Sequence, residues 1–250
     1  MDNSEIFDTF LFIGPEKLEI LVKNKNDKSS YYRNKISIEH TEKEINLLLI
    51  DKFLNQNIFK IEKEFNFFVK NIFLIIDDDQ FLSVKVSFKR KNDKDIFNLK
   101  NLNYLLKEAK YQINESYKEK VIIHMIIDNY SIDNKIYKNL PEDVECDQFS
   151  ISMNFICIAM KYIRQIEKIL GNYQIKIQQI ISVQYLRDIF GNNNDDFLGG
   201  GSLLETFSIF ATTSCKCLFN NGSSAFKNSK AGPLPSFLRN ILSVASIAPF

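Results

Sequence analysis

Few residues in this chain could carry catalysis, and none of them is spaced for it. The 250 residues include two histidines and four cysteines. His124 lies inside the apolar run 121–127, whereas a general base needs a partner group and an open site. No second histidine or carboxylate is placed to serve it, and no Ser/His/Asp or Cys/His arrangement can be argued. We therefore expect a hydrogen-bonded structural histidine, no catalytic residue and no enzymatic activity.

Metal chemistry is not indicated either. The cysteines do not form a Cys-x-x-Cys array, which argues against structural zinc; they are Cys146, Cys157, Cys215 and Cys217. Cys157 stands in an alternating apolar run, as expected of a small buried residue in a reduced protein. The run Asp77–Asp79 directly follows an apolar stretch, and adjacent like charges are more typical of a solvated turn than of a metal site. We expect no metal and no cofactor.

The charge balance restricts the class of partner. The formal net charge is +1, which gives no electrostatic case for nucleic-acid binding. The basic run Lys89–Lys91 is typical of a solvated surface, and contact with lipid headgroups or an acidic partner is the alternative. Asp2, Glu5 and Asp8 replace the basic start of a secretory signal, and no apolar run approaches the roughly 20 residues of a membrane span. We expect a cytoplasmic protein.

Hydrophobic periodicity predicts an α/β fold. Residues 81–183 read as strand, helix, strand, strand, helix, strand. The first helix is expected over 99–116, the run 121–127 as a fully covered strand, and the second helix from Ile156 to a stop at Gly171. Residues 1–80 read as a hairpin (10–13 and 18–22), a third strand (31–38), a helix and a strand (71–77). That helix is expected to begin at the capping box Thr41–Glu44 and to break at Asn55–Asn57.

The segment HMIIDNYSID and the element order around it resemble FtsA, the bacterial actin-like protein that tethers the division ring to the membrane. The matching residues are His124, Tyr130, Ile132, Asp133 and Pro141; the family's first proline and its later Gly-Met are not matched. The resemblance covers about residues 8–185. It implies a partial actin-like, ribonuclease-H-like subdomain 1A (1–80, with a return strand in 173–190). A strand-helix-strand-strand subdomain 1C (81–172) is inserted, and 191–250 would be a flexible tail.

Nucleotide chemistry in actin-like ATPases is placed at the first hairpin turn, which resembles Asp-x-Gly-Thr. The corresponding residues here are Phe12, Ile13, Gly14 and Pro15. Phenylalanine offers no oxygen to Mg²⁺, and proline has no N–H for a phosphate. Lys17 remains, although a single lysine is more often a solvated surface residue. The resemblance therefore implies a degenerate phosphate turn and no ATP hydrolysis.

The last 60 residues differ in composition from the rest, with seven charged residues and six of the eight glycines. Gly199–Ser202 invites comparison with the second phosphate loop of actin-like proteins, but a flexible linker is the simpler interpretation. An amphipathic segment near the end could contact a membrane weakly through Phe237, Leu238, Arg239, Ile241 and Leu242. The alternatives are a tail that packs on the domain, a disordered tail, and a change of coding frame near residue 190.

Taken together, the sequence favours a truncated, degenerate FtsA-like protein that acts by protein–protein interaction. Its expected partners are divisome proteins, FtsZ or later division proteins, and it is expected either to self-associate or to depend on a partner. Weak peripheral membrane contact at the division site is part of that prediction. Two alternatives stay open: an actin-like ATP-binding protein and a PilM-like pilus-assembly adaptor.

Overall fold

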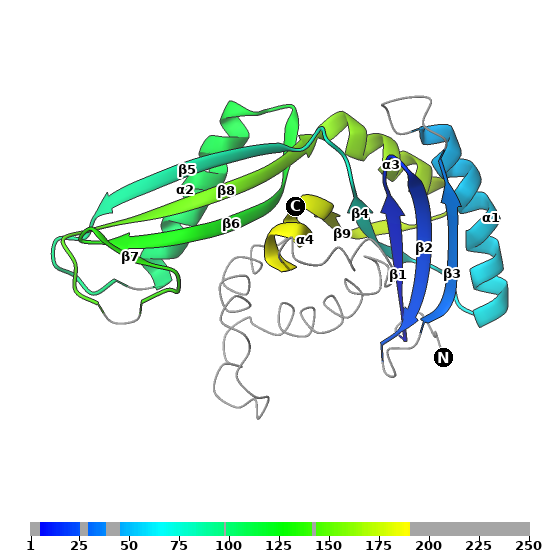
Figure 1. Cartoon of the computed structure of the whole chain (residues 1–250), viewed down its shortest axis with the longest axis horizontal. Helices are drawn as coiled ribbons and strands as arrows, with labels where there is room; N and C mark the ends of the chain where they lie inside the picture. The colour runs from blue at the N-terminus through cyan, green and yellow to red at the C-terminus, as the bar shows by residue number, and fades with distance from the viewer. Residues whose placement is uncertain (1–5, 26–29, 39–45, 98, 142–143, 191–250) are drawn as a thin grey trace. The chain divides into compact units, whose positions relative to one another are not determined.

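The computed structural model describes residues 6–25, 30–38, 46–97, 99–141 and 144–190. Over these residues the chain has a mixed α/β fold with two sheets (Figure 1). The described residues divide into two compact units, 6–81 with 160–190, and 82–159. The second unit is thus inserted into the first.

The first unit contains a five-stranded mixed sheet in the order β3-β2-β1-β4-β9. Neighbouring strands are antiparallel from β1 to β3 and parallel from β1 through β4 to β9. This is the strand order of a ribonuclease-H-like sheet, so the predicted partial actin-like fold class is confirmed. The strands are β1 (Phe7–Ile13), β2 (Lys17–Asn24), β3 (Ser30–Ser37), β4 (Asn71–Ile76) and β9 (Lys176–Ser182).

Helix α1 (Leu47–Phe65) is continuous, and the predicted break at Asn55–Asn57 is wrong. Asn57 is wholly buried. Its amide donates to the carbonyl of Phe53 at 2.6 Å and accepts from the Tyr32 hydroxyl and the Asn34 amide of β3 at 2.7 Å each. A polar residue that fastens the helix to the sheet is therefore compatible with the helix interior.

The start of α1 also differs from the prediction. Asn46 is the N-cap, and its side chain accepts from the backbone N–H of Leu49 at 3.1 Å. This satisfies one of the free N–H groups of the first turn. The expected capping box Thr41–Glu44 lies outside the described residues. The described part of this unit has two more helices, α3 (Met160–Asn172) and α4 (Val183–Phe190), and α1 packs on α3.

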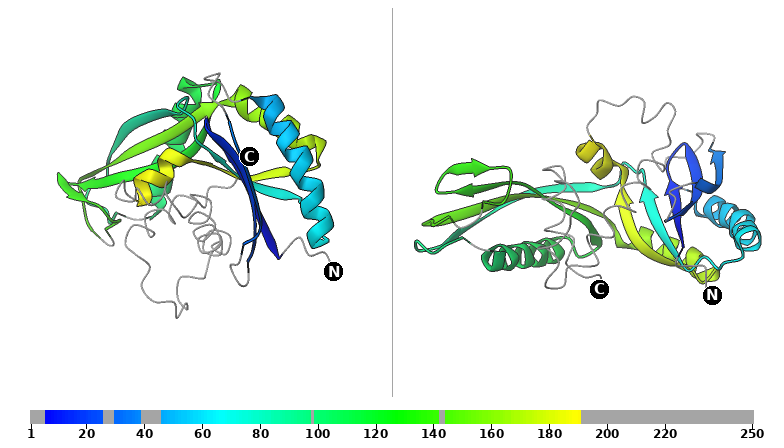
Figure 2. Two further views of the ribbon diagram at one scale, coloured as in Figure 1. Left: turned by 45° about the vertical axis from the view of Figure 1, so that its right-hand side comes forward. Right: turned by 90° about the horizontal axis from the view of Figure 1, so that it is seen from below.

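The second unit is a four-stranded antiparallel sheet in the order β5-β8-β6-β7, with helix α2 along one face (Figure 2). Alternate residues of β5, β6 and β8 pack with the apolar stripe of α2 into one core, and Leu105 at 2% exposure lies in it. The predicted helix over 99–116 is confirmed. The elements are β5 (Leu82–Lys91), α2 (Leu99–Ser116), β6 (Lys120–Ile132), β7 (Lys135–Tyr137) and β8 (Gln148–Ala159).

Three predictions about this unit are corrected. Ile156 and Ala159 belong to strand β8, which continues directly into α3 at Met160. Helix α3 lies in the first unit, so the inserted unit ends at Ala159 rather than at residue 172. Strand β6 is longer than expected and mostly half-exposed rather than fully covered, and its register shifts twice, at Ile122/His124 and Ile127/Asn129.

Within the described residues, no helix is both long and apolar enough to cross a membrane.

Candidate functional site

The turn between β1 and β2 is the place where an actin-like protein would hold phosphate, and here its backbone is engaged within the protein. The N–H of Gly14 donates to the carbonyl of Lys17 at 3.0 Å, which closes the turn. The carbonyl of Ile13 accepts from the N–H of Asp77, and that of Glu16 from the N–H of Ile38, both at 2.8 Å. Pro15 has no N–H to offer. Anion-binding nests need successive free N–H groups, and neither Gly14 nor Pro15 supplies one.

The side chain of Phe12 fills the space beside this turn. Phe12 is 4% exposed, and its Cε1 would lie 2.7 Å from a Cβ added at Gly14. No real Cβ tolerates such a contact, so this ring position requires glycine at residue 14. The Nζ of Lys17 lies 5.0 Å from the centroid of the Phe12 ring, within cation–π range. An aromatic ring and a stacked lysine therefore occupy the place where Mg²⁺ and phosphate binding would need a carboxylate and an open turn.

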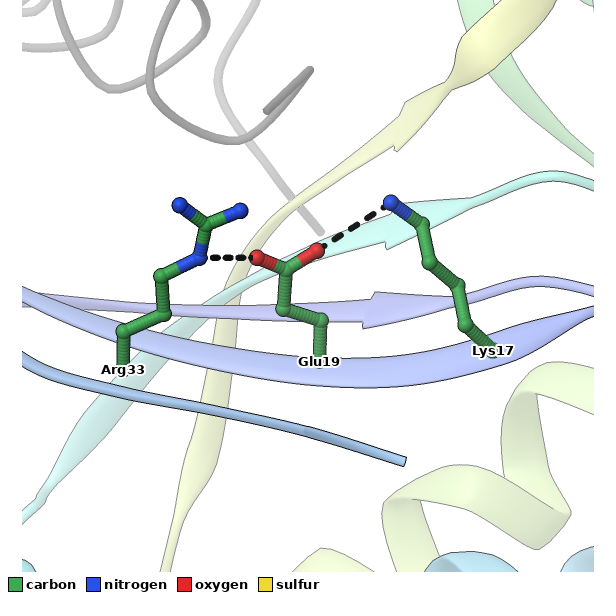
Figure 3. A network of polar contacts seen from close by, with 3 residues as sticks. All are labelled: Lys17, Glu19 and Arg33. Carbon is green, nitrogen blue, oxygen red and sulfur yellow. Dashed lines mark hydrogen bonds and ion pairs between the residues drawn. The ribbon is translucent and has the colours of Figure 1, made fainter. Parts of the chain in front are cut away.

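Lys17 also belongs to a polar network on the sheet (Figure 3). The Glu19 carboxylate, whose side chain is fully buried, accepts from Lys17 Nζ at 3.2 Å and from Arg33 Nε at 2.7 Å. Both cationic side chains are about one-third exposed, at 37% and 35%. A buried carboxylate is tolerated only when it is paired and hydrogen-bonded. The network therefore holds Lys17 in place, and we interpret it as structural support for the turn.

Glu19 and Arg33 were missed by the sequence analysis. The available signal was a single acid inside the apolar run Leu18–Val22, because acids are almost never fully buried unless they are paired. Lys17, two residues earlier on the same strand face, was the first candidate partner. Arg33 could be found only once β3 was registered against β2, where Glu19 pairs with Lys35 and lies next to Arg33.

Three other candidate residues, His124, Cys146 and Cys157, belong to the inserted unit. His124 is on β6 in the inserted unit, 8% exposed, and burial lowers its pKa to about 3. Such an imidazole is neutral at neutral pH. Cys146 and Cys157 are both buried, and burial raises the pKa of each thiol, which disfavours the reactive thiolate.

The acidic run Asp77–Asp79 forms a turn after β4, in which the Asp78 carboxylate accepts from the N–H of Gln80 at 2.8 Å. Among the described residues, no group of three or more His, Cys, Asp or Glu side chains could hold a metal ion. The basic run Lys89–Lys91 is exposed at the end of strand β5. Gly199–Ser202, the membrane-contact candidates Phe237–Leu242, and Cys215 and Cys217 lie outside the described residues.

Comparison with known proteins gives structural likenesses only. No family model matches the sequence, and no curated protein matches it significantly. A PilM–PilN type IV pilus biogenesis complex is similar over 73% of this chain and 49% of that chain, at 11% identity and a TM-score of 0.47. The cytoplasmic domain of EpsL, an inner-membrane component of the type II secretion system of Vibrio cholerae, is similar over 70% and 57%, at 10% identity and a TM-score of 0.32.

A third similar structure is a Bacteroides thetaiotaomicron protein with an actin-like ATPase fold and unknown function, over 75% of this chain and 56% of that chain, at 10% identity and a TM-score of 0.37. The chain thus spans about half of the length of these solved chains. None of the three is named as FtsA. The fold assignment itself follows from the strand order and directions of the first sheet.

Proposed function

We propose that this chain is an actin-like assembly protein that acts by protein–protein interaction and does not hydrolyse ATP. The carrying observation is the filled turn: Phe12 packs against Gly14, Pro15 lacks an N–H, and Lys17 is held by Phe12 and Glu19. A metal-bound triphosphate would need an oxygen ligand at residue 12 and free N–H groups at residues 14 and 15. The residues present supply neither.

Within that class, the resemblance of His124–Asp133 to FtsA supports a role in the assembly of the division machinery, on the cytoplasmic side of the membrane. A PilM-like pilus-assembly adaptor is the alternative that the sequence left open. The two proposals differ in where the protein acts in the cell. A fluorescent fusion that gathers at mid-cell supports the division role, whereas foci that follow the pilus or secretion machinery support the adaptor role.

Isothermal titration of the full chain with Mg-ATP tests the absence of nucleotide function. We expect no binding in the micromolar range, because neither Gly14 nor Pro15 gives a free amide to the phosphates. The Lys17→Ala variant is the matched control. If the parent shows a heat of binding with Mg-ATP and the variant does not, Lys17 contacts a phosphate. A micromolar dissociation constant for the parent contradicts the proposal and favours the ATP-binding alternative.

A further inference from the structure

Strand β5 forms one edge of the second sheet, and its outer side has no strand partner among the described residues (Figure 1). It spans ten residues, Leu82–Lys91, whereas strands average about five to six. A long edge strand presents a row of N–H and C=O groups that another chain can pair with. Native edges are usually short, bulged, covered or charged. The pairing of β5 with β8 runs without a register shift, so charge is the one of these features that β5 carries.

The two faces of β5 carry different chemistry. Lys85, Lys89 and Lys91 are exposed on one face, with the exposed Ser87 between the first two. No described residue forms an ion pair with these three lysines. The residues opposite these lysines on β8 carry amides or a hydroxyl and no carboxylate. Lys85 pairs with Asn154, Lys89 with Ser150 and Lys91 with Gln148. This face therefore presents a row of positive charge that lacks a counter-charge on the neighbouring strand.

The opposite face of β5 is apolar and incompletely covered. Its side chains pack against the core under α2 but are only half-buried: Leu82, Val84, Val86 and Phe88. Beyond them, Arg90 stacks on Tyr104 of α2, with its Cζ 4.4 Å from the ring centroid. An added strand would bring its own apolar side chains beside this row, and the area removed from water would stabilise the pairing.

The positive charge of these lysines also restricts which kind of strand could be added to the edge. Two β5 edges from two copies would bring lysine rows together, and like charges opposite each other are destabilising. A strand with acidic side chains at alternate positions would pair with the lysines on one face and place its apolar residues on the other. The charge pattern thus disfavours a second copy and favours an acidic partner.

We propose that the free edge of β5 docks an extended segment of another protein that alternates acidic and apolar residues, added as a fifth strand. This inference deepens the proposed function, since it names a surface and a partner chemistry for an interaction protein, and it rests on that function. The two are tested separately: nucleotide binding reports on the β1–β2 turn, and peptide binding reports on β5.

The test uses the full chain and a fluorescein-labelled ten-residue peptide that alternates glutamate with valine and threonine. Two control peptides carry lysine in place of glutamate, or proline at alternate non-acidic positions, which keeps the charge but prevents pairing. Fluorescence anisotropy should show binding of the acidic peptide alone. Hydrogen exchange should show new protection of the amides in 82–91 when that peptide is bound.

Charge-reversal variants test whether the acidic peptide binds at β5. Changing Lys85, Lys89 and Lys91 together to Glu should weaken binding of the acidic peptide at least tenfold, about 1.4 kcal/mol, and should allow the lysine peptide to bind. The matched control makes the same change in net charge at exposed lysines elsewhere: Lys107→Glu, Lys161→Glu and Lys168→Glu. It should alter binding less than twofold.

Any one of four results would overturn the proposal. The acidic peptide does not bind, or the proline peptide binds equally well, or the control triple variant weakens binding as much as the β5 variant. If the protection falls on residues other than 82–91, the acidic segment binds elsewhere and the β5 assignment is also wrong.

Discussion

Acidification should weaken the second unit through one residue, His124. Its imidazole is buried on β6, at the register shift where it pairs with Ile156, and burial lowers its pKa from 6.5 to about 3. Between these values the unfolded chain binds a proton at this residue and the folded chain does not. The unfolded state therefore holds more protons there, and stability falls as pH falls.

The magnitude follows from the two pKa values. With an unfolded pKa near 6.5 and a folded pKa near 3, the imidazole is almost fully neutral in the fold at pH 5. Protonation of the unfolded state then lowers the free energy of unfolding by about 2 kcal/mol from pH 7 to pH 5. The stabilisation is fully present above pH 6.5 and is lost as pH falls toward 3.

The assay is hydrogen exchange of the slowest amides of β6 and β8, corrected for intrinsic rates, because it reports the opening free energy of this unit. The parent is compared with His124→Gln at pH 7 and pH 5, and His40→Gln serves as the control for the other histidine. The parent should lose about 2 kcal/mol more than the His124 variant on acidification. Equal losses in the two proteins would mean that His124 is protonated in the fold, and the reasoning would fail.

Two stability predictions concern buried residues of the helices. Leu105→Asp should unfold the second unit, at a cost of more than about 4 kcal/mol, because it places an unpaired carboxylate in the core under α2; Asn103→Asp on the exposed face of the same helix is the control, and equal melting of the two variants would contradict the helix-face assignment. Asn57→Leu should lower the free energy of unfolding of the first unit by about 2–4 kcal/mol, because the Tyr32 hydroxyl and the Asn34 amide lose their acceptor. Chemical denaturation checks this against Asn55→Leu, and a loss no larger than that of the control would show that these hydrogen bonds contribute little.

The sequence predicted those elements whose periodicity has a single interpretation. Six apolar residues at helical spacing gave the helix 99–116, and alternation gave β5 and the body of β8. The junction at Ala159 was misplaced because Ile156 and Ala159 fit both the strand period and the helical stripe that follows them. Covalent continuity without a loop leaves no turn residue to mark the change.

The candidate site was predicted in part, for a related reason. Phe12, Gly14 and Pro15 are local, and their types alone suggest that the turn is poor at holding phosphate. The Glu19 network was missed because Arg33 comes from another strand, and Asn57 was misread as a helix break because its partners lie on β3. Polar residues whose partners are distant in sequence look like breaks or surface positions until the register is known.

The pairing of β4 with β9 has a consequence for how the chain is made. Strand β4 ends at Ile76, β9 begins at Lys176, and the whole unit 82–159 lies between them. During synthesis the inserted unit is therefore completed before β9, the last strand of the first sheet, is available to pair. Once that unit folds, Leu82 pairs with Cys157, so its two ends are held together. Each halving of the flexible loop between β4 and β9 saves about 0.6 kcal/mol of closure entropy. We therefore expect the inserted unit to fold first. By holding its two ends together, it lowers the entropy cost of pairing β9 with β4 in the first sheet.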